Sequence, residues 1–398
     1  MPEANIVVFA LRLFSRCIST SRCMVFIMAT TIQTEQIGKL GFGYMRLPRK
    51  GGAFDMEQIN KMADAFLESG GTYFDAAYVY EGAEVALRES LMKRYPRDKV
   101  QIATKLNLHP VSSQQHLREQ FNISLERLGV DYVDFYLLHG ISSKSSKKAE
   151  DVGAWDYLSE LKSKGLIRHM GFSFHAPPED LEDILNKHPE AEFVQLQINY
   201  NDWNNPDVQS RRMYEVARKY DKPIIVMEPL LAGLLASDTS PIASLLRGAN
   251  PNASIASWAL RFVAALDGVF VTLSGMSSLE QMKDNIATYA NLNPLSIEEH
   301  AIIDKAVEII NAAPRIACTN CRYCVKDCPS NIQIPSLIEI YNDYLVHNTA
   351  TNLDGSYRWQ TSAAGKACDC IACRVCEEIC PQSLEIVDTL AKISEMFD

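Results

Sequence analysis

The sequence predicts a (β/α)8 barrel followed by a small helical domain that is rich in cysteine. Three observations predict this arrangement. The chain has 398 residues, which is more than a single average domain of about 150 residues needs. Between about residue 38 and residue 290, short apolar runs alternate with amphipathic stretches. Nine of the eleven cysteines then lie between Cys318 and Cys380.

Eight short apolar runs are the expected strands of the barrel. They are rich in β-branched residues and nearly continuous in apolar character, as parallel strands that are buried on both faces require. Eight strand–helix units within about 250 residues match the usual size of a (β/α)8 barrel. The expected strands are residues 39–44, 72–75, 100–106, 132–139, 167–174, 193–200, 223–229 and 269–275.

Amphipathic stretches between these runs are the expected helices. A doubly wound sheet would also alternate strands with helices, but no G-x-G-x-x-G turn follows the first run, so the barrel is favoured. A further helix is expected at residues 296–312, and Pro314 ends it. The helices expected within the barrel include residues 56–68, 84–94, 113–127, 155–164, 207–219 and 254–265.

The two ends of the chain differ in composition from the barrel. Residues 1–27 carry arginines among apolar residues, but they lack the positive first region and the small-residue cleavage site of a signal peptide. Met28 resembles an ordinary start. We therefore expect residues 1–34 to be a disordered extension or the product of an upstream start codon. Residues 35–313 would form the barrel and residues 314–398 the cysteine-rich domain.

Composition and charge exclude several classes of protein. Apolar residues make up 47% of the chain and charged residues 22%, as in ordinary globular proteins. The net charge of −10 argues against nucleic acid or an anionic membrane as the main partner. The longest apolar run, within the first 28 residues, is broken by arginines, so no transmembrane helix is predicted. Cysteines crowded into one segment indicate metal ligation in a reducing compartment, which predicts a cytoplasmic and anaerobic protein.

Two cysteine runs share the spacing C-x2-C-x2-C-x3-C-P. This is the ligand run of bacterial [4Fe–4S] ferredoxins, in which the fourth cysteine of each run binds the other cluster. Structural zinc also uses C-x2-C pairs, but usually as separated pairs. The ferredoxin pattern gives Cys318, Cys321, Cys324 and Cys380 to one cluster, gives Cys370, Cys373, Cys376 and Cys328 to the other, and leaves Cys368 outside both.

Ionisable residues end three successive expected strands. Asp75, Lys105 and His139 stand at the ends of the second, third and fourth strands, and Tyr80 follows Asp75 by five residues. Each alone has a structural explanation, such as a helix cap, a packed histidine or a lysine that reaches solvent. Together they are costly to bury unless they are paired, and barrel active sites lie at the carboxyl ends of the strands. They therefore indicate an active site.

The same residues lie in segments that resemble the aldo/keto reductase superfamily. The tail resembles the ferredoxin-like domain that is fused to one branch of this superfamily, so the resemblance covers about residues 35–398. It implies a (β/α)8 barrel that uses NADPH or NADH without flavin or a catalytic metal. The segments are GFGYMRLP at 41–48, FDAAYVY at 74–80, ATK at 103–105, LLH at 137–139 and GFS at 171–173.

The resemblance implies a catalytic tetrad of Asp75, Tyr80, Lys105 and His139. Tyr80 would protonate the carbonyl oxygen as hydride arrives from the nicotinamide. An ordinary tyrosine has a pKa of about 10, so Tyr80 needs a neighbouring cation, and Lys105 held by Asp75 would supply it. His139 would hydrogen-bond the substrate oxygen; branches that reduce steroid C=C bonds carry glutamate there, so His139 favours carbonyl or alcohol chemistry. Tyr78 is a rival of Tyr80, but a spacing of five residues is that of the family.

The resemblance also implies contacts to the nucleotide. The lysine and arginine that often hold the 2′-phosphate are replaced by Gly275 and Gln281, and only Lys283 is nearby. Without such a cation, the choice between NADP and NAD stays open. The matching positions are Ser173 and Gln195 for the nicotinamide carboxamide, Met227 for the nicotinamide ring, and Ser274, Gly275 and Asn285 for the adenosine half.

Three functions fit these residues. The first is an NAD(P)-linked oxidoreductase that acts on a small-molecule carbonyl or alcohol and carries two [4Fe–4S] clusters. The second is an iron–sulfur electron-transfer module whose barrel is a platform that binds a nucleotide or a partner. In the third, the clusters only brace the tail. Nicotinamides carry two electrons and clusters one, and the sequence has no flavin signature to join them. We therefore expect the tail to be dispensable for hydride transfer and to serve a separate redox protein or to brace the barrel.

Overall fold

The computed structural model describes residues 37–108, 110–206, 208–318, 320, 322–350, 352–380 and 382–398. The expected N-terminal extension, residues 1–34, and Cys321 lie outside the described residues. The chain forms two compact units. The first contains the residues up to Ile198, Asp202–Met227 and Val263–Asn291, and the second contains Asn199–Asn201, Glu228–Phe262 and Leu292–Asp398. The expected boundary at residue 313 stays a prediction from the sequence.

The first unit is a closed barrel of eight strands, as the sequence predicts. Each strand pairs in parallel with its two neighbours in the order β1-β10-β9-β8-β7-β6-β5-β4. All eight expected strands are confirmed. They are β1 (Leu40–Gly43), β4 (Tyr73–Asp75), β5 (Gln101–Asn107), β6 (Val133–Ile141), β7 (Ile167–Phe174), β8 (Phe193–Gln197), β9 (Ile224–Met227) and β10 (Val269–Ser274).

The interior of the barrel is a layer of apolar side chains. The ring of Phe135 lies at its centre, 5.0 Å from the ring of Tyr73 and 5.4 Å from the ring of Phe193. Side chains of a strand alternate between its two faces, so these residues define the inward-facing positions of their strands. The layer consists of Tyr73, Ala103, Phe135, Leu137, Phe193, Ile225, Val271 and Leu273.

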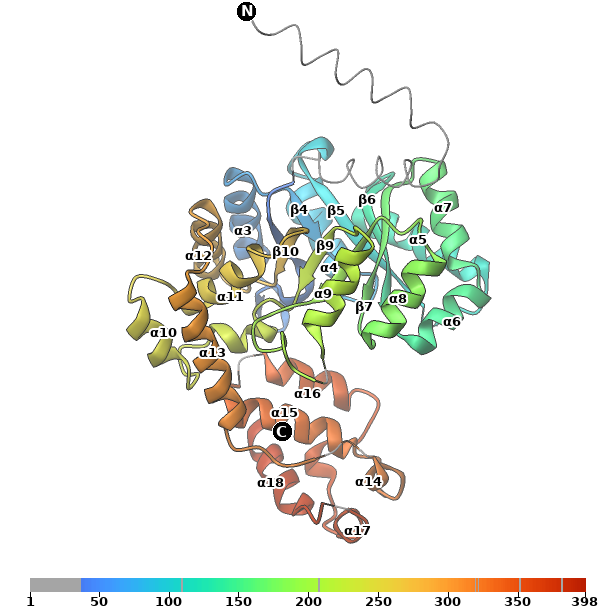
Figure 1. Ribbon diagram of the computed structural model, residues 1–398. Coiled ribbons are helices and arrows are strands. Elements are labelled where there is room, and N and C mark those ends of the chain that lie inside the picture. Colours follow the sequence, from blue (N-terminus) through green and yellow to red (C-terminus); the bar gives the residue numbers. More distant parts are fainter. Residues whose placement is uncertain are drawn as a thin grey trace, which may run out of the picture. The chain divides into compact units, whose positions relative to one another are not determined.

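Helices surround the strands of this unit (Figure 1). Asp55 caps the first of them, because its Oδ1 accepts a hydrogen bond of 3.1 Å from the backbone N–H of Gln58. The helix expected at 207–219 begins at Ser210, and Asp207 lies outside the described residues. The helices are α3 (Met56–Glu68), α4 (Ala83–Leu87) with a π-helical continuation (Arg88–Met92), α5 (Gln114–Leu128), α6 (Ser143–Asp151), α7 (Ala154–Ser163), α8 (Pro178–Lys187), α9 (Ser210–Lys219) and α12 (Leu279–Ala290).

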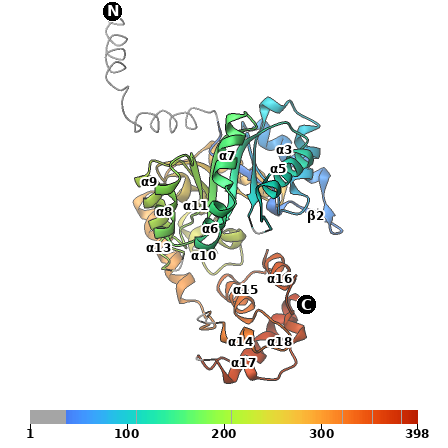
Figure 2. The ribbon, with the colours of Figure 1, turned by 90° about the vertical axis from the view of Figure 1, so that its right-hand side faces the viewer.

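The second unit is helical and contains all the described cysteines. Figure 2 shows the short helices α14 and α17 together at one end of the cysteine-rich domain, with α15 and α16 toward the other. The core of this unit is apolar and includes Ile334, Leu337 and Leu390. The helices are α10 (Ala243–Ala249), α11 (Ile255–Ala264, whose last two residues belong to the first unit), α13 (Ile297–Ala312), α14 (Tyr323–Lys326), α15 (Ile334–His347), α16 (Leu353–Thr361), α17 (Val375–Glu378) and α18 (Ile386–Phe397).

Membrane insertion was tested on the helices. Within the described ranges, none is long and apolar enough to cross a bilayer.

Candidate functional site

The predicted site residues continue the inward-facing pattern of the barrel layer. Asp75 lies two residues beyond the inward-facing Tyr73, and Lys105 lies two residues beyond Ala103. A spacing of two keeps a side chain on the same face of its strand. The same spacing joins Leu137 to His139, Gly171 to Ser173, Phe193 to Gln195 and Ile225 to Met227. Six predicted residues therefore point into the barrel at the carboxyl ends of its strands, where barrel active sites lie.

Lys105 and Asp75 form a buried ion pair between neighbouring strands. The ammonium of Lys105 donates to Oδ1 of Asp75 at 2.5 Å and to the carbonyl oxygen of Ala76 at 2.7 Å. The side chain of Lys105 is 0% exposed and that of Asp75 is 5% exposed. Burial lowers the pKa of Lys105, but the charges of Asp75 and Tyr80 outweigh burial and raise the pKa. Lys105 therefore remains a cation.

Tyr80 and His139 lie beside this ion pair. The ammonium of Lys105 is 5.0 Å from the centroid of the Tyr80 ring. The rings of Tyr80 and His139 meet edge to face, with centroids 5.6 Å apart and an angle of 84° between the planes. The structure thus brings all four predicted tetrad residues together. Tyr78 instead lies under the guanidinium of Arg127, 4.6 Å from it, which separates this rival tyrosine from Lys105.

His139 is a neutral imidazole in the folded protein. Burial is the main cause that lowers its pKa from 6.5 to about 3, and the charges of Lys105 and His175 lower it further. A neutral ring carries one N–H donor and one acceptor nitrogen. His139 can therefore hydrogen-bond a substrate oxygen, but it does not act as a proton source near neutral pH.

Two buried side chains suit the carboxamide of a nicotinamide. The hydroxyl oxygen of Ser173 accepts a hydrogen bond of 2.8 Å from the N–H of Gly140, which leaves its own hydrogen to donate. The amide of Gln195 donates to the sulfur of Met227 at 3.6 Å. Its Oε1 is buried and has no hydrogen-bond partner among the residues that the structure describes. A buried acceptor without a donor is rare in native proteins, and the amide of a nicotinamide would supply one. These residues fit the group.

The positions predicted for the adenosine half lie at the end of β10. The side-chain amide of Asn285 donates to the hydroxyl of Ser274 at 2.8 Å, and both residues are buried. A Cβ placed on Gly275 would lie 3.7 Å from Cβ and Cδ of Arg46. The hydroxyl of Ser277 also donates to the carbonyl oxygen of Arg46 at 2.7 Å. A cation thus stands where the sequence comparison left a gap.

Sequence reasoning missed Arg46, although one signal was present. Arg46 ends the short 3-10 helix Tyr44–Arg46 directly after β1, and β1 pairs with β10. In a closed barrel the first and last strands are neighbours, so the loops that follow them lie side by side. The arginine of the GFGYMRLP segment was therefore a candidate for the β10 loop.

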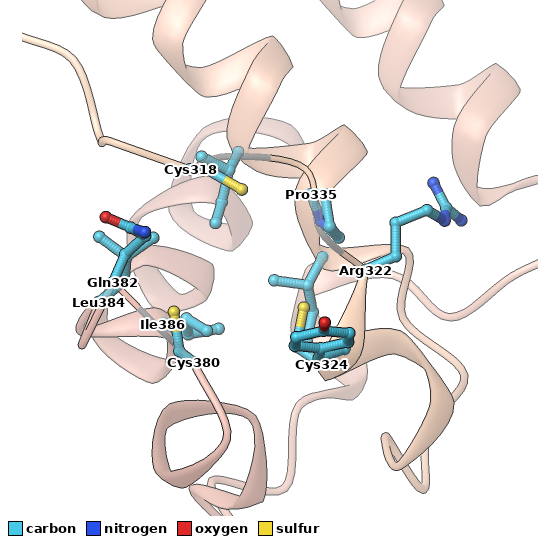
Figure 3. Close-up of a pocket in the computed structure, with 11 residues that line it drawn as sticks. Cys318, Arg322, Cys324, Pro335, Cys380, Gln382, Leu384 and Ile386 are labelled. Atoms are coloured by element: carbon cyan, nitrogen blue, oxygen red, sulfur yellow. The ribbon is translucent and has the colours of Figure 1, made fainter.

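The cysteines surround two pockets in the second unit. The first, of about 340 Å³, is lined by Cys318, Cys324 and Cys380, whose thiols face its hollow (Figure 3). The second, of about 330 Å³, is lined by Cys328, Cys370, Cys373 and Cys376. Each pocket therefore takes one cysteine from the other run, as the ferredoxin pattern requires. Cys368 lines neither pocket.

The shape of the pockets favours iron–sulfur clusters over single zinc ions. Zinc draws four ligands to about 2.3 Å from one point. No group of three His, Cys, Asp or Glu side chains in the described part of the chain converges in that way. Each pocket instead has about ten times the volume of roughly 30 Å³ that a water occupies in the liquid. Cysteines spread around such a space fit a cluster, whose irons lie at separate corners.

Comparison with known proteins agrees with both parts of this description. Residues 39–308 match the aldo/keto reductase family, and residues 317–385 match a 4Fe-4S dicluster domain. The aldo-keto reductase str7 of Strobilurus tenacellus is 26% identical over 313 residues, which cover 68% of this chain and 89% of that protein.

Solved structures share the barrel. The holo form of aldo-keto reductase AKR11C1 from Bacillus halodurans has a TM-score of 0.54 and 26% identity, and the match covers 68% of this chain and 92% of that chain. An aldo-keto reductase from Klebsiella pneumoniae in complex with NADPH has a TM-score of 0.55 and 20% identity, with 68% and 90% covered. With two thirds of its length matched to one family, the chain belongs to the aldo/keto reductases, as an oxidoreductase that carries a C-terminal 4Fe-4S dicluster domain.

Proposed function

We propose that this protein interconverts a small-molecule carbonyl compound and its alcohol with NADP(H), and that its C-terminal domain holds two [4Fe–4S] clusters. The observation that carries the proposal is the buried Lys105–Asp75 ion pair at 2.5 Å, with Tyr80 and His139 beside it. A barrel used only as a binding platform has no need of a fully buried lysine at its mouth, since burying a charge is costly.

In this proposal Tyr80 is the proton donor. A bound nicotinamide would supply hydride to the carbonyl carbon. The hydroxyl of Tyr80 gives its proton to the carbonyl oxygen, so that hydride and proton together convert C=O into CH–OH. The ammonium of Lys105 stabilises the tyrosinate that remains, and Asp75 holds Lys105 in place. Alcohol oxidation runs the same proton back to Tyr80.

His139 and the nucleotide contacts position the reactants. The neutral His139 hydrogen-bonds the substrate oxygen and keeps it near Tyr80. Ser173 and Gln195 hold the carboxamide, and the polarizable sulfur of Met227 packs against the ring. Ser274, Gly275 and Asn285 would hold the adenosine half, as the list of predicted contacts has it.

Arg46 supports a preference for NADP(H) over NAD(H). It places a guanidinium-bearing side chain against Gly275, where family members often carry a phosphate-binding lysine. Arginine is the side chain best suited to phosphate, because its planar fork offers several donors and a permanent charge.

The two cysteine pockets support two [4Fe–4S] clusters. Cys318, Cys324 and Cys380 with Cys321 would hold one, and Cys370, Cys373, Cys376 and Cys328 the other. When bound, such clusters carry one electron each, so we assign them to exchange with a separate redox protein rather than to the hydride step. Eight thiolate ligands suit a reducing, oxygen-poor cytoplasm.

Replacement of Tyr80 by phenylalanine tests the proton donor. Tyr80→Phe should lower carbonyl reduction by about 100-fold or more, because general acid catalysis is lost. NADPH binding, followed by fluorescence titration, should stay near that of the wild type. Tyr78→Phe is the matched control and should keep its activity. Near-wild-type turnover by Tyr80→Phe would remove Tyr80 from the mechanism.

The buried His139 predicts a pH dependence of stability. Because its pKa is about 3 in the folded protein and 6.5 ordinarily, the unfolded chain binds a proton that the folded protein refuses. This contribution to stability is complete above pH 6.5 and is lost as pH falls from 6.5 toward 3. Between pH 7 and pH 5.5, the melting temperature of His139→Gln should therefore fall less than that of the wild type. His116→Gln, which changes an exposed histidine, is the control. Parallel pH profiles of His139→Gln and the wild type would contradict the prediction.

Iron analysis tests the number of clusters. Protein purified without oxygen should contain about eight iron atoms per chain and show the broad visible absorption of thiolate-bound clusters. Cys373→Ser should lose iron, because Cys373 lines a pocket, whereas Cys368→Ser should keep it. Zinc in place of iron, or about four irons in the wild type, would refute the two-cluster arrangement.

Arg46→Gln tests the nucleotide preference. The Kd for NADPH should rise at least about tenfold, as expected for the loss of a hydrogen bond to a charged group. The Kd for NADH should change less. Arg49→Gln is the control, because Arg49 is exposed and stacks on Phe54 at 4.4 Å. Equal losses for NADPH and NADH in Arg46→Gln would rule out recognition of the 2′-phosphate.

A further inference from the structure

The loop that follows β9 joins the proposed nicotinamide contact to the cysteine-rich unit. β9 ends at Met227, and the next residue, Glu228, begins a loop that runs through the short 3-10 segment Leu231–Ala236. From Glu228 onward this loop belongs to the second compact unit. The strand end and the loop are consecutive in the chain, so the loop's conformation fixes how the chain leaves Met227.

This loop has a backbone that its own residues do not favour. Glu228, Leu231 and Ala232 have φ angles of 52°, 47° and 54°, in the left-handed region that side chains other than glycine rarely adopt. Such conformations persist only where the surroundings hold them, and they cluster at functional sites. Within the loop, the carboxylate of Glu228 accepts a hydrogen bond of 2.6 Å from the N–H of Ala232.

Asn352 of the dicluster domain holds the same segment from outside. Its side-chain amide donates to the carbonyl oxygen of Ala232 at 2.5 Å. Asn352 precedes α16 with a φ of 65°, but its side chain makes no capping hydrogen bond to that helix. The amide is therefore committed to the loop. A second link follows nearby, where the hydroxyl of Thr239 donates to the backbone carbonyl of Asn348 at 2.9 Å.

Apolar packing ties the loop to the walls of the cysteine pockets. Leu234 is buried in the same core cluster as Cys324 and Cys376, and Leu231 packs against that cluster. Ile334, another member, lines both cysteine pockets. The loop after β9 is therefore part of the core on which cluster binding depends.

We propose that Asn352 is a positioning residue for nucleotide binding, through which the dicluster domain holds the β9 loop in its binding conformation. This inference rests on the proposed function. A loop that is already ordered binds more tightly, because the cost of ordering it is not charged to the ligand. The iron–sulfur domain thus raises nucleotide affinity without taking part in hydride transfer.

Two glycine substitutions separate this role from a purely local one. Asparagine tolerates the left-handed region, so Asn352 could serve only the start of α16. Asn352→Gly keeps the left-handed conformation and removes the amide donor. Asn348→Gly is the matched control: Asn348 has a φ of 48°, and its link to Thr239 uses the backbone carbonyl, which glycine keeps.

The experiment uses the full chain with its clusters in place. Fluorescence titration with NADPH should show about fivefold weaker binding by Asn352→Gly, the size of one lost hydrogen bond. Iron content and kcat at saturating NADPH should stay at wild-type values, and Asn348→Gly should bind NADPH like the wild type. Asn352→Asp, which keeps the shape but not the donor, should reproduce the loss if Asn352→Gly loses iron.

Each other outcome overturns the proposal. Wild-type affinity in both Asn352 variants, or equal losses in Asn352→Gly and Asn348→Gly, would show that the amide does not position the loop. A lower kcat at saturating NADPH with unchanged affinity would give Asn352 a different role. If the wild type itself binds no NADPH, the proposed function fails, which is a separate result.

Discussion

The buried ion pair of Lys105 and Asp75 is the interaction on which the active site depends. An ammonium that is 0% exposed must be paired, because a single buried charge is severely destabilising. The parallel pairing of β4 with β5 sets Asp75 opposite Ala103, two residues before Lys105, so the register of the barrel decides whether the pair can form. The same cation then faces Tyr80 and lowers the pKa of His139. One electrostatic contact therefore sets the protonation of the whole site.

Features that depend on local pattern could be predicted from the sequence, and features that depend on contacts between distant segments could not. The eight strands follow from apolar runs, and Asp75, Lys105 and His139 follow from a period of two along each strand. The pairing of cysteine runs follows from their spacing. Arg46 and Asn352 were missed because each acts on a segment far away in the chain, at Gly275 and Ala232. Helix α6 was missed because Ser143–Asp151 has almost no apolar face to reveal it.

The molecule keeps two kinds of electron chemistry in separate parts of the chain. The residues proposed for hydride transfer all belong to the first compact unit, and the cysteine pockets belong to the second. The β9 loop is the place where the two meet in the sequence, since Met227 ends one unit's strand and Glu228 begins the other unit's loop. A barrel with iron–sulfur clusters therefore needs no flavin for the clusters to affect the nucleotide, because a mechanical link serves where an electronic one would be difficult.

The crosswise arrangement of the cysteine pockets has a consequence for how the protein is made. The first pocket draws Cys380 from the second run, and the second pocket draws Cys328 from the first. Neither ligand set is complete until the ribosome has passed Cys380, long after the last barrel strand ends at Ser274. Domains generally fold in the order of synthesis, so the barrel precedes metal delivery. The cellular machinery that supplies iron and sulfide then meets a domain that must accept both clusters as one interlocked step.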